Sequence, residues 1–511
     1  MRNVSRAWPL WVALAGLTAH AAAQAPARSS AAPAASTLKQ VAYIKASNPG
    51  EEDKFGDIIA LSGDGNTLAV GAPLESSAAK GINGKGANDP GLSSGAVYVY
   101  ARNGTRWVEQ AYVKASNPGA DDQFGYGVGL SADGNTLVVS APYEDSGATG
   151  VNGNQEDNSV ENSGAVYVFS RSGSTWSQQA YLKASNTGEK DEGDQFGYSV
   201  AVSGDGNTVA VGAIGEDSAA TGINGNQKDN TAGGSGATYV FTRSGNAWSQ
   251  QAYVKSSTAA RNALFGYSVS LSATGDTMAV GAFDEDRGKG ALYVFTRSGG
   301  TRAQQARVQA ASLDPQDSMG CWVAISDDGN TIAAGALDED TLAPGINAVK
   351  SGDSGRVDAP DDTSAGAAYV FTRSGTAWTE QANFKASNVG RDDWFGVRLA
   401  LSGDGNTLVV GAPNEDSAAK GINGKQDDDS ADGAGAAYLF TRAGTTWKQE
   451  YYMKGSNTEQ FDEFGSSMAL SRDGRTMAVG AHFESGGAKG VNGNEADNSV
   501  PHSGAAYVFV R

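Results

Sequence analysis

Acidic and amide side chains recur in four long segments of the chain, and their order suggests a cation site in each segment. A Glu-Asp pair or a lone Glu comes first, an Asn-Gly-Asn or a single Asn follows, and further acids come last. Ca²⁺ takes about six to eight oxygen ligands of this kind, and glycine allows the sharp bends that such a site requires. In three of these segments the candidate ligands are Glu144, Asp145, Asn152, Asn154, Asp157, Glu216, Asp217, Asn224, Asn226, Asp229, Glu415, Asp416, Asn423 and Asp427, and the fourth segment begins at Glu484. The alternative, which we favour, is that Asn and Asp side chains stabilise their own turns while the remaining acids are solvated.

A catalytic group is harder to assemble from the same sequence. His20 lies in the N-terminal apolar region, and His482 and His502 form neither a Ser-His-Asp order nor a metal-binding spacing. Paired carboxylates for glycoside cleavage are possible almost anywhere in so acidic a chain, and no pair is singled out. Cys321 is the only cysteine, so it forms no internal disulfide, and we expect it to fill a packing position. The sequence therefore favours a protein without catalytic activity.

The elements that position these residues come from one repeated unit. Its pattern is a strand, a tight turn such as Asp205-Gly206-Asn207, and a second strand. A supersecondary unit that recurs along the chain predicts a repeat architecture. The seven copies start at Phe55, Phe124, Phe196, Phe265, Met319, Phe395 and Phe464. The aspartates in the tight turns are interpreted as hairpin residues.

Each repeat contains enough sequence for four short strands. The second and third strands, such as 67–72 and 165–169, are apolar on both faces, which predicts strands covered by a layer on each side. The fourth, such as 176–183, alternates large apolar and polar residues and ends in lysine. We interpret it as an outer strand whose lysine discourages edge pairing. Four antiparallel strands in each of several stacked repeats describe the blades of a β-propeller.

The two ends of the repeat region predict a closed ring. Residues 40–48 are a copy of the fourth strand with no repeat before them, and the repeat that starts at Phe464 stops after its third strand. No sheet edge is left open if the N-terminal copy completes the last blade. We therefore predict an all-β protein, a seven-bladed β-propeller of four-stranded antiparallel blades over residues 38–511. Most of the length variation falls between second and third strands, so these insertions should emerge on one face.

Two further side chains recur nearly once per repeat. An aspartate two residues before the Phe-Gly position is interpreted as an acceptor of backbone N–H groups between blades, the alternative being an acidic rim for a cationic ligand. Tryptophans at the start of the fourth strand are interpreted as packing residues rather than as a surface that stacks on sugars. The aspartates are Asp53, Asp122, Asp194, Asp317, Asp393 and Asp462, and the tryptophans are Trp107, Trp176, Trp248, Trp378 and Trp447. Trp322 and Trp394 fall outside this series.

The N-terminal region and the overall charge bear on location and partners. In residues 1–23, Arg2 and Arg6 precede an apolar run and small residues, which predicts a signal peptide, and the run is too short to span a membrane. Residues 24–37, rich in alanine, proline and serine, predict a flexible leader. The formal net charge of −19 disfavours nucleic acid and anionic membrane surfaces. We expect an exported, monomeric protein that is secreted, held at the cell surface or periplasmic.

The repeat resembles the FG-GAP repeat. The resemblance rests on the Phe-Gly that opens most repeats and on endings of the second strand such as Gly71-Ala72-Pro73, although four repeats lack the proline. That family forms the seven-bladed propeller of integrin α subunits and of many bacterial exported proteins, which implies extracellular binding or adhesion, often with calcium in its loops. The integrin calcium loop lies between the first two strands. Here the corresponding hairpin, residues 62–66, has too few acids for Ca²⁺, so we do not carry that site over.

Three functions follow from these observations, and we favour the first. It is a non-catalytic binding or adhesion protein whose loops meet an extracellular protein or glycan on one face. The second is a polysaccharide hydrolase or lyase, suggested by the divergent fifth repeat with Cys321, Trp322 and an acidic insert at 349–362. The third is a structural component of a cell surface or matrix, which would self-associate.

Overall fold

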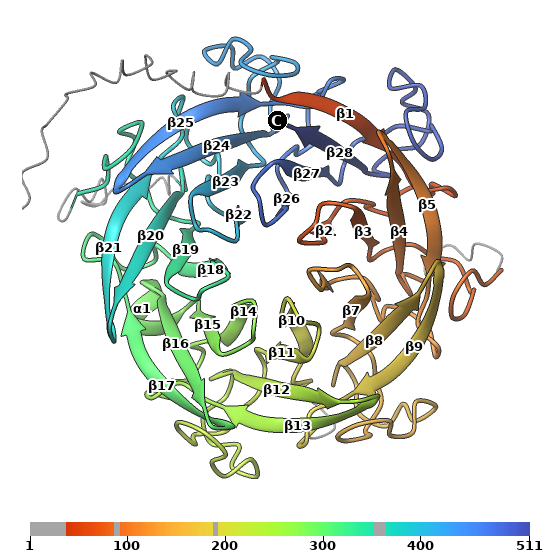
Figure 1. Ribbon diagram of the computed structural model, residues 1–511, viewed down its shortest axis with the longest axis vertical. Coiled ribbons are helices and arrows are strands. Elements are labelled where there is room, and N and C mark those ends of the chain that lie inside the picture. The colour runs from red at the N-terminus through yellow and green to blue at the C-terminus, as the bar shows by residue number, and fades with distance from the viewer. Residues whose placement is uncertain (1–36, 86–91, 188–192, 351–363) are drawn as a thin grey trace, which may run out of the picture. The chain divides into compact units, whose positions relative to one another are not determined.

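The computed structural model describes residues 37–85, 92–187, 193–350 and 364–511. The chain divides into two units, Met1–Thr37 and Leu38–Arg511. The predicted signal peptide and all of the predicted leader except Thr37 lie outside the described residues. The second unit consists of seven four-stranded antiparallel sheets arranged as blades around a central channel (Figure 1). The predicted seven-bladed propeller is therefore confirmed.

In six of the blades the strands run outward from the channel in chain order, and in the last blade the N-terminal strand is the outer one. The first strands lie at the channel: β2 (Ile58–Leu61), β6 (Val128–Leu130), β10 (Phe196–Val202), β14 (Phe265–Leu271), β18 (Met319–Ile325), β22 (Leu399–Leu401) and β26 (Ser467–Leu470). The second strands are β3 (Thr67–Ala72), β7 (Thr136–Ala141), β11 (Thr208–Ala213), β15 (Thr277–Ala282), β19 (Thr331–Ala336), β23 (Thr407–Ala412) and β27 (Thr476–Ala481). Every residue of these second strands is buried, as their apolar sequences predict.

The outer half of each blade is a hairpin. The third strands are β4 (Ala96–Asn103), β8 (Ala165–Ser172), β12 (Ala237–Ser244), β16 (Ala291–Ser298), β20 (Ala367–Ser374), β24 (Ala436–Ala443) and β28 (Ala505–Val510). The fourth strands are β5 (Arg106–Val113), β9 (Thr175–Leu182), β13 (Ala247–Val254), β17 (Thr301–Val308), β21 (Ala377–Phe384), β25 (Thr446–Met453) and, for the last blade, β1 (Lys39–Ile44). The element α1 (Glu285–Gly288) is a single turn in the short connection of blade four.

The ring is closed by the N-terminal strand. Strand β1 pairs antiparallel with β28, with Tyr43 opposite Tyr507 and Lys39 opposite Val510. The last sheet therefore has the order β1-β28-β27-β26, and it joins residues from the two ends of the propeller unit. This is the closure that the unmatched copy of the fourth strand predicts.

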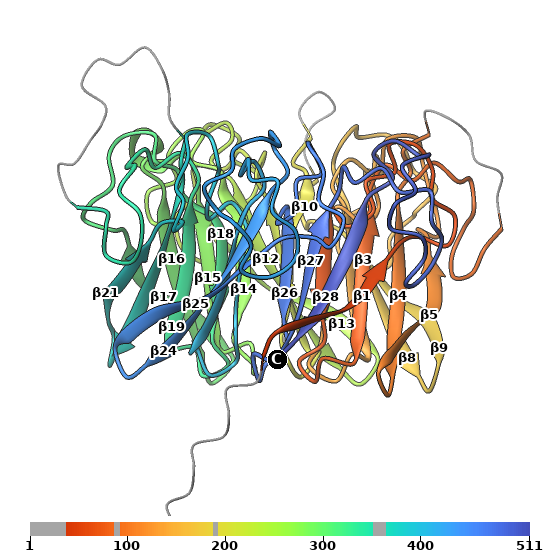
Figure 2. The same ribbon diagram turned by 90° about the horizontal axis from the view of Figure 1, so that it is seen from above.

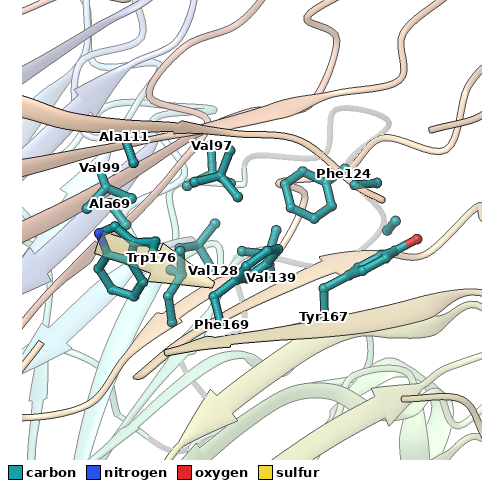
Figure 3. Packing of buried hydrophobic residues seen from close by; sticks show 14 of the residues in the cluster. Ala69, Val97, Val99, Ala111, Phe124, Val128, Val139, Tyr167, Phe169 and Trp176 are labelled. Atoms are coloured by element: carbon teal, nitrogen blue, oxygen red, sulfur yellow. The ribbon is translucent and has the colours of Figure 1, made fainter. Parts of the chain in front are cut away.

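Neighbouring blades are held together by apolar layers between their faces. Figure 3 shows one such layer, in which Val97 and Val99 of blade one meet Val139 and Phe169 of blade two. The recurrent tryptophans belong to these layers, as predicted, and four of the five are buried while Trp378 is partly buried. The indole Nε1 of Trp176 donates to Oε1 of Gln110 on the fourth strand of the preceding blade at 2.8 Å. Burial of apolar area between blades thus stabilises the ring.

The Phe-Gly sequence makes the crossing from one blade to the next. The Phe55 ring is buried and packs edge-on against Tyr98 at 5.3 Å, while its N–H donates to the Ser503 carbonyl of the preceding blade. Gly56 has φ +97°, and a Cβ at this position would lie 2.4 Å from the Ala505 carbonyl oxygen. Only glycine fits such a close approach of two backbones.

The tight turns between first and second strands close one end of the channel. In each turn the aspartate accepts local bonds, as Asp133 does from the Asn135 N–H at 3.0 Å, so these acids act as turn residues as predicted. Backbone hydrogen bonds then link neighbouring turns around the whole ring: Asp64 to Ala132, Ala132 to Gly204, Asp205 to Ala273, Ala273 to Asp327, Asp327 to Gly403, Gly403 to Arg472 and Arg472 to Gly63. We call this side of the ring the turn face.

The Arg472 side chain extends across the turn-face end of the channel. Its Nε lies 3.3 Å from Asp327 Oδ1 in blade five. Cβ atoms added at Gly63 in blade one or Gly204 in blade three would clash with it. Because one side chain reaches the turns of three other blades, the channel is obstructed at this end.

The long connections between second and third strands emerge together on the opposite side, which we call the loop face (Figure 2). The predicted common face of the insertions is therefore confirmed. Blade four is the exception, since residues 283–290 with α1 form its whole connection. Most of the acidic insert predicted at 349–362 lies outside the described residues.

Candidate functional site

The glutamates of the predicted cation ligands are bound by protein groups. Glu144 Oε1 accepts hydrogen bonds from Asn117 and Tyr181, and its Oε2 accepts from the Ser146 N–H and from Lys183 Nζ at 2.9 Å. Glu216 and Glu415 have equivalent lysine, tyrosine and asparagine partners. Each of these carboxylates already meets a cation, so it lacks the free oxygens that a metal ion would need.

The lysines that end the fourth strands are these cations. We interpreted them as edge residues that discourage strand pairing, and that interpretation is wrong. Their side chains are 0% exposed and pair with a glutamate at the start of the long connection of the same sheet: Lys45–Glu484, Lys114–Glu75, Lys183–Glu144, Lys255–Glu216, Lys385–Glu339 and Lys454–Glu415. Burial lowers the pKa of Lys183, and the Glu144 carboxylate opposes this shift. The loops cover the ends of the fourth strands, which places the ammonium groups inside.

The predicted asparagine ligands shape the loops. Asn152 has φ +56°, in the left-handed region that asparagine tolerates, and its Oδ1 accepts the Tyr181 N–H at 3.0 Å. Asn224 and Asn423 accept the N–H groups of Tyr253 and Tyr452 in the same way. Asn154 and Asn226 each accept the N–H group two residues further on. These amides stabilise turns and dock the loops on the fourth strands.

The remaining predicted ligands either accept hydrogen bonds from the protein backbone or are exposed to solvent. Asp145, Asp217 and Asp416 each accept a backbone N–H seventeen residues further along the loop. Asp157 and Asp229 each accept the backbone N–H of the residue two positions further on. Asp427 is exposed, and its Oδ1 lies 3.6 Å from Lys425 Nζ. Within the described residues, no three His, Cys, Asp or Glu side chains gather as a metal site would require. The predicted donors therefore do not fit Ca²⁺, and calcium binding stays a prediction.

The recurrent aspartates before Phe-Gly accept backbone N–H groups, which is the role we favoured. Asp122 Oδ2 accepts the Gly119 N–H at 2.6 Å, and Asp53, Asp317, Asp393 and Asp462 make the same contact three residues back. Burial raises the pKa of Asp122 to about 7, with the Glu144 carboxylate acting in the same direction against the Gly119 bond. These groups lie next to the buried lysine–glutamate pairs, so they do not form an exposed acidic rim.

A cavity of about 250 Å³ lies at the loop-face end of the channel, and we call it the cup. It is lined by the starts of the first strands of blades one to six. The side chain two residues after each Phe position (after Met319 in blade five) differs from blade to blade: Asp57, Tyr126, Tyr198, Tyr267, Cys321, Val397 and Ser466. Val128, Val200, Val269 and Val323 line the cup further along the strands, toward the obstructed turn face. The repeat thus keeps its backbone and varies its side chains at the channel.

Three tyrosines form one wall of the cup. The Tyr198 ring centroid lies 5.4 Å from that of Tyr126 and 5.0 Å from that of Tyr267, with the rings tilted by about 50° to each other. Phe283 stacks on Tyr267 at 4.4 Å, and Tyr143 lies edge-on to Tyr126. Burial and the neighbouring Tyr198 raise the pKa of Tyr126 and of Tyr267, so both hydroxyls stay protonated. This wall offers partly exposed aromatic rings with polar edges.

Polar groups of blades five, six and one complete the cup, and His482 lies behind Asp57. The guanidinium of Arg398 lies over the Trp322 ring at 4.4 Å, and its Nη1 donates to the Val397 carbonyl. His482 lies between two carboxylates, with Nδ1 3.2 Å from Asp57 and Nε2 3.2 Å from Glu463. Cys321 is buried, and burial raises the pKa of its thiol to about 12, which disfavours a nucleophilic thiolate. It fills a packing position, as predicted.

Sequence reasoning missed both the lysine–glutamate pairs and the tyrosines of the cup. A signal for the first is present, because a lysine directly after the last apolar residue of the fourth strand recurs together with a glutamate after the second strand. The tyrosines follow Phe-Gly directly in three successive repeats. Trp322, which the sequence singled out, lines the cup, whereas Trp394 is 37% exposed elsewhere in the loops.

The chain belongs to the FG-GAP repeat family. The model of the FG-GAP repeat matches residues 38–100, 107–169, 176–241, 248–295, 378–440 and 447–509. The match omits most of blade five, the repeat with Met319 in place of phenylalanine. A search of curated proteins finds no match.

Two solved structures are similar in fold. The periplasmic gluconolactonase of Pseudomonas aeruginosa is 14% identical with a TM-score of 0.46, over 83% of this chain and 98% of its own. A β-propeller domain from Myceliophteria thermophila is 10% identical with a TM-score of 0.47, over 86% of this chain and 95% of its own. No helix in the described part of the chain is long and apolar enough to cross a membrane.

Proposed function

We propose that this protein is an exported, non-catalytic binding propeller that takes an extracellular ligand, a glycan, at the cup on its loop face. The observation that carries the proposal is the wall formed by Tyr126, Tyr198 and Tyr267. Partly exposed aromatic rings gathered in a concave site, with a few polar groups around them, are typical of ligand pockets. The long loops surround the same end of the channel and would add contacts to a larger ligand.

The arrangement supports binding rather than catalysis. Cys321 is buried with a raised thiol pKa, which disfavours a nucleophilic thiolate at the cup. Tyrosine rings can stack on the C–H faces of a sugar while their hydroxyls bond to its oxygens. The net charge of the chain is −19, so a polyanion would be repelled. A neutral ligand, or one with a single charge that one side chain recognises, suits this surface better. Export is part of the proposal and rests on the sequence of residues 1–23.

A glycan array combined with a hydrolysis and lyase screen tests the proposal. The Tyr198→Ala variant should lose about two- to ten-fold in affinity for the glycans bound by the wild type, because one stacked ring contributes on the order of 0.5–1.5 kcal/mol. The matched control is Val108→Ala, an exposed apolar residue of the outer strand β5, which should bind as the wild type does. Equal melting temperatures show that both variants are folded. Glycan binding unaffected by Tyr198→Ala, or product release by the wild type, would overturn the proposal.

A further inference from the structure

We infer that the cup recognises a sugar that carries a carboxylate, a uronic acid residue at the end of a glycan, and that Arg398 binds this carboxylate. The inference rests on the proposed function and specifies the ligand of the same site. It follows from the charges that line the cup and from the free bonding capacity of one guanidinium.

Arg398 is a cation without an acid. Among the described residues, its Nη1 donates to the Val397 carbonyl at 3.1 Å, whereas Nε is buried without a hydrogen-bond partner. No described carboxylate lies within ion-pair distance of it, although other arginines such as Arg297 and Arg472 are paired. Its guanidinium carbon lies over the Trp322 ring at 4.4 Å, and this cation–π contact helps to position the group. A planar, oriented guanidinium with unused N–H groups matches the geometry of a carboxylate.

The part of the cup around Asp57 suits hydroxyl groups. Asp57 belongs to blade one and Arg398 to blade six, so the two charges flank blade seven on either side. The Asp57 carboxylate lies against His482 Nδ1 and can accept hydrogen bonds from sugar hydroxyls. Besides Arg398, the charged residue that lines the cup is Asp57, and the titratable groups behind it are His482 and Glu463.

The three kinds of surface match one chemical class. The tyrosine wall fits the C–H face of a pyranose ring, Asp57 fits hydroxyls, and Arg398 fits a single carboxylate. A peptide C-terminus would present its carboxylate and one side chain, and it would leave Asp57 without a partner of its own. The volume of about 250 Å³ accommodates one sugar residue. Because Arg472 obstructs the turn face, a chain cannot thread through the ring, which favours recognition of a terminal residue.

Titration of the exported chain with glucuronic acid and with glucose, followed by saturation-transfer NMR and calorimetry, tests the inference. The wild type should bind glucuronic acid about ten-fold more tightly than glucose or more, because a charge-assisted bidentate contact is available only to the acid. Arg398→Gln should abolish this preference while its affinity for glucose stays within about two-fold, and Arg398→Lys should restore part of it. Tyr198→Ala should lower the affinity for both sugars.

The matched control is Arg472→Gln, which removes an arginine from the opposite end of the same channel and should leave the preference intact. Melting temperatures establish that each variant is folded. Equal affinities for the two sugars in the wild type, or an unchanged preference in Arg398→Gln, would overturn the carboxylate inference and leave the binding proposal standing. Binding of C-terminal peptides in place of both sugars would overturn it in favour of a peptide ligand. Glycans that bind independently of Tyr198 would refute the proposed function itself.

Discussion

The buried lysine–glutamate pairs connect strands, loops and neighbouring blades through single side chains. Lys183 contacts Glu144 and Ser163, and Glu144 in turn holds Asn117 of the preceding blade. Blade four shows that the position needs a cation: its lysine is replaced by Gln309, and Arg307 pairs with Glu285 at 2.8 Å instead. A buried carboxylate without a cation is strongly unfavourable, which explains why the substitution is compensated.

Removal of one such lysine should therefore destabilise the propeller. Lys183→Met leaves the Glu144 carboxylate buried and unpaired, which should cost about 3–5 kcal/mol in the free energy of unfolding. Chemical denaturation measures this loss, and the double variant Lys183→Met/Glu144→Leu should recover most of it. The control is Lys425→Met, because Lys425 is 71% exposed beside Asp427 and such pairs contribute under about 1 kcal/mol. Equal losses for the two lysines would contradict the prediction.

The aspartates before Phe-Gly predict a dependence of stability on pH. Burial raises the pKa of Asp122 from 3.8 to about 7, and the same holds for Asp53, Asp317, Asp393 and Asp462. Between these two values the folded chain binds protons that the unfolded chain has released, so stability falls as pH rises through this window. The free energy of unfolding, measured by chemical denaturation, should therefore be higher near pH 5 than near pH 8, by at most about 1.4 kcal/mol per group for each pKa unit.

The Asp122→Asn variant is the control for that pH dependence. An asparagine oxygen can still accept the Gly119 N–H, but the side chain no longer titrates. Its plot of unfolding free energy against pH should therefore be shallower than that of the wild type. A stability that increases steadily from pH 5 to pH 8 in the wild type would show that these carboxyls are ionised in the folded chain.

At the scale of elements, each blade combines an invariant frame with a variable inner edge. Phe-Gly crossings and Asp-Gly turns recur because their backbone conformations allow few residues, as Gly56 shows with its φ of +97°. The side chains that face the channel carry no such restriction, and they differ among all the blades except the three that supply tyrosines. The long loops are held on the fourth strands by asparagines in the left-handed region, such as Asn152.

The loops provide a test of calcium binding. We expect EDTA to leave the melting temperature and the pattern of limited proteolysis unchanged, because Glu144, Asp145 and Asn152 are already hydrogen-bonded within the protein. Differential scanning calorimetry with and without added Ca²⁺ gives the measurement. A loss of several degrees on chelation, restored by Ca²⁺ and not by Mg²⁺, would show that the loops rearrange around an ion.

At the scale of the whole molecule, stability depends on closure of the ring. Strand β1 supplies the outer strand of the last blade, and Lys45 beyond it supplies the cation for Glu484. The same segment contributes Tyr43, whose hydroxyl donates to Glu484 at 2.8 Å. Loss of this segment would therefore expose the edge of β28 and leave a buried carboxylate unpaired.

Deletion of residues 1–48 should give a chain that melts at a markedly lower temperature or associates through the open edge of β28. Deletion of residues 1–36 alone is the matched control and should melt as the full chain does, since it retains β1. Calorimetry and size-exclusion chromatography distinguish the two variants. A monomeric, equally stable chain without residues 38–48 would show that closure by β1 contributes little.

The sequence by itself determined the seven repeats, the four strands of each blade, the shared loop face and the closure by residues 40–48. These features follow from backbone requirements and apolar periodicity, which are local and repeat along the chain. Only the tertiary structure decided that the lysines at the ends of the fourth strands are buried. They are covered by a loop of the same blade, whose glutamate also binds an asparagine of the preceding blade. The tertiary structure alone also formed the cup, because Tyr198, Trp322, Arg398 and Asp57 come from four different blades and converge only when the ring is complete.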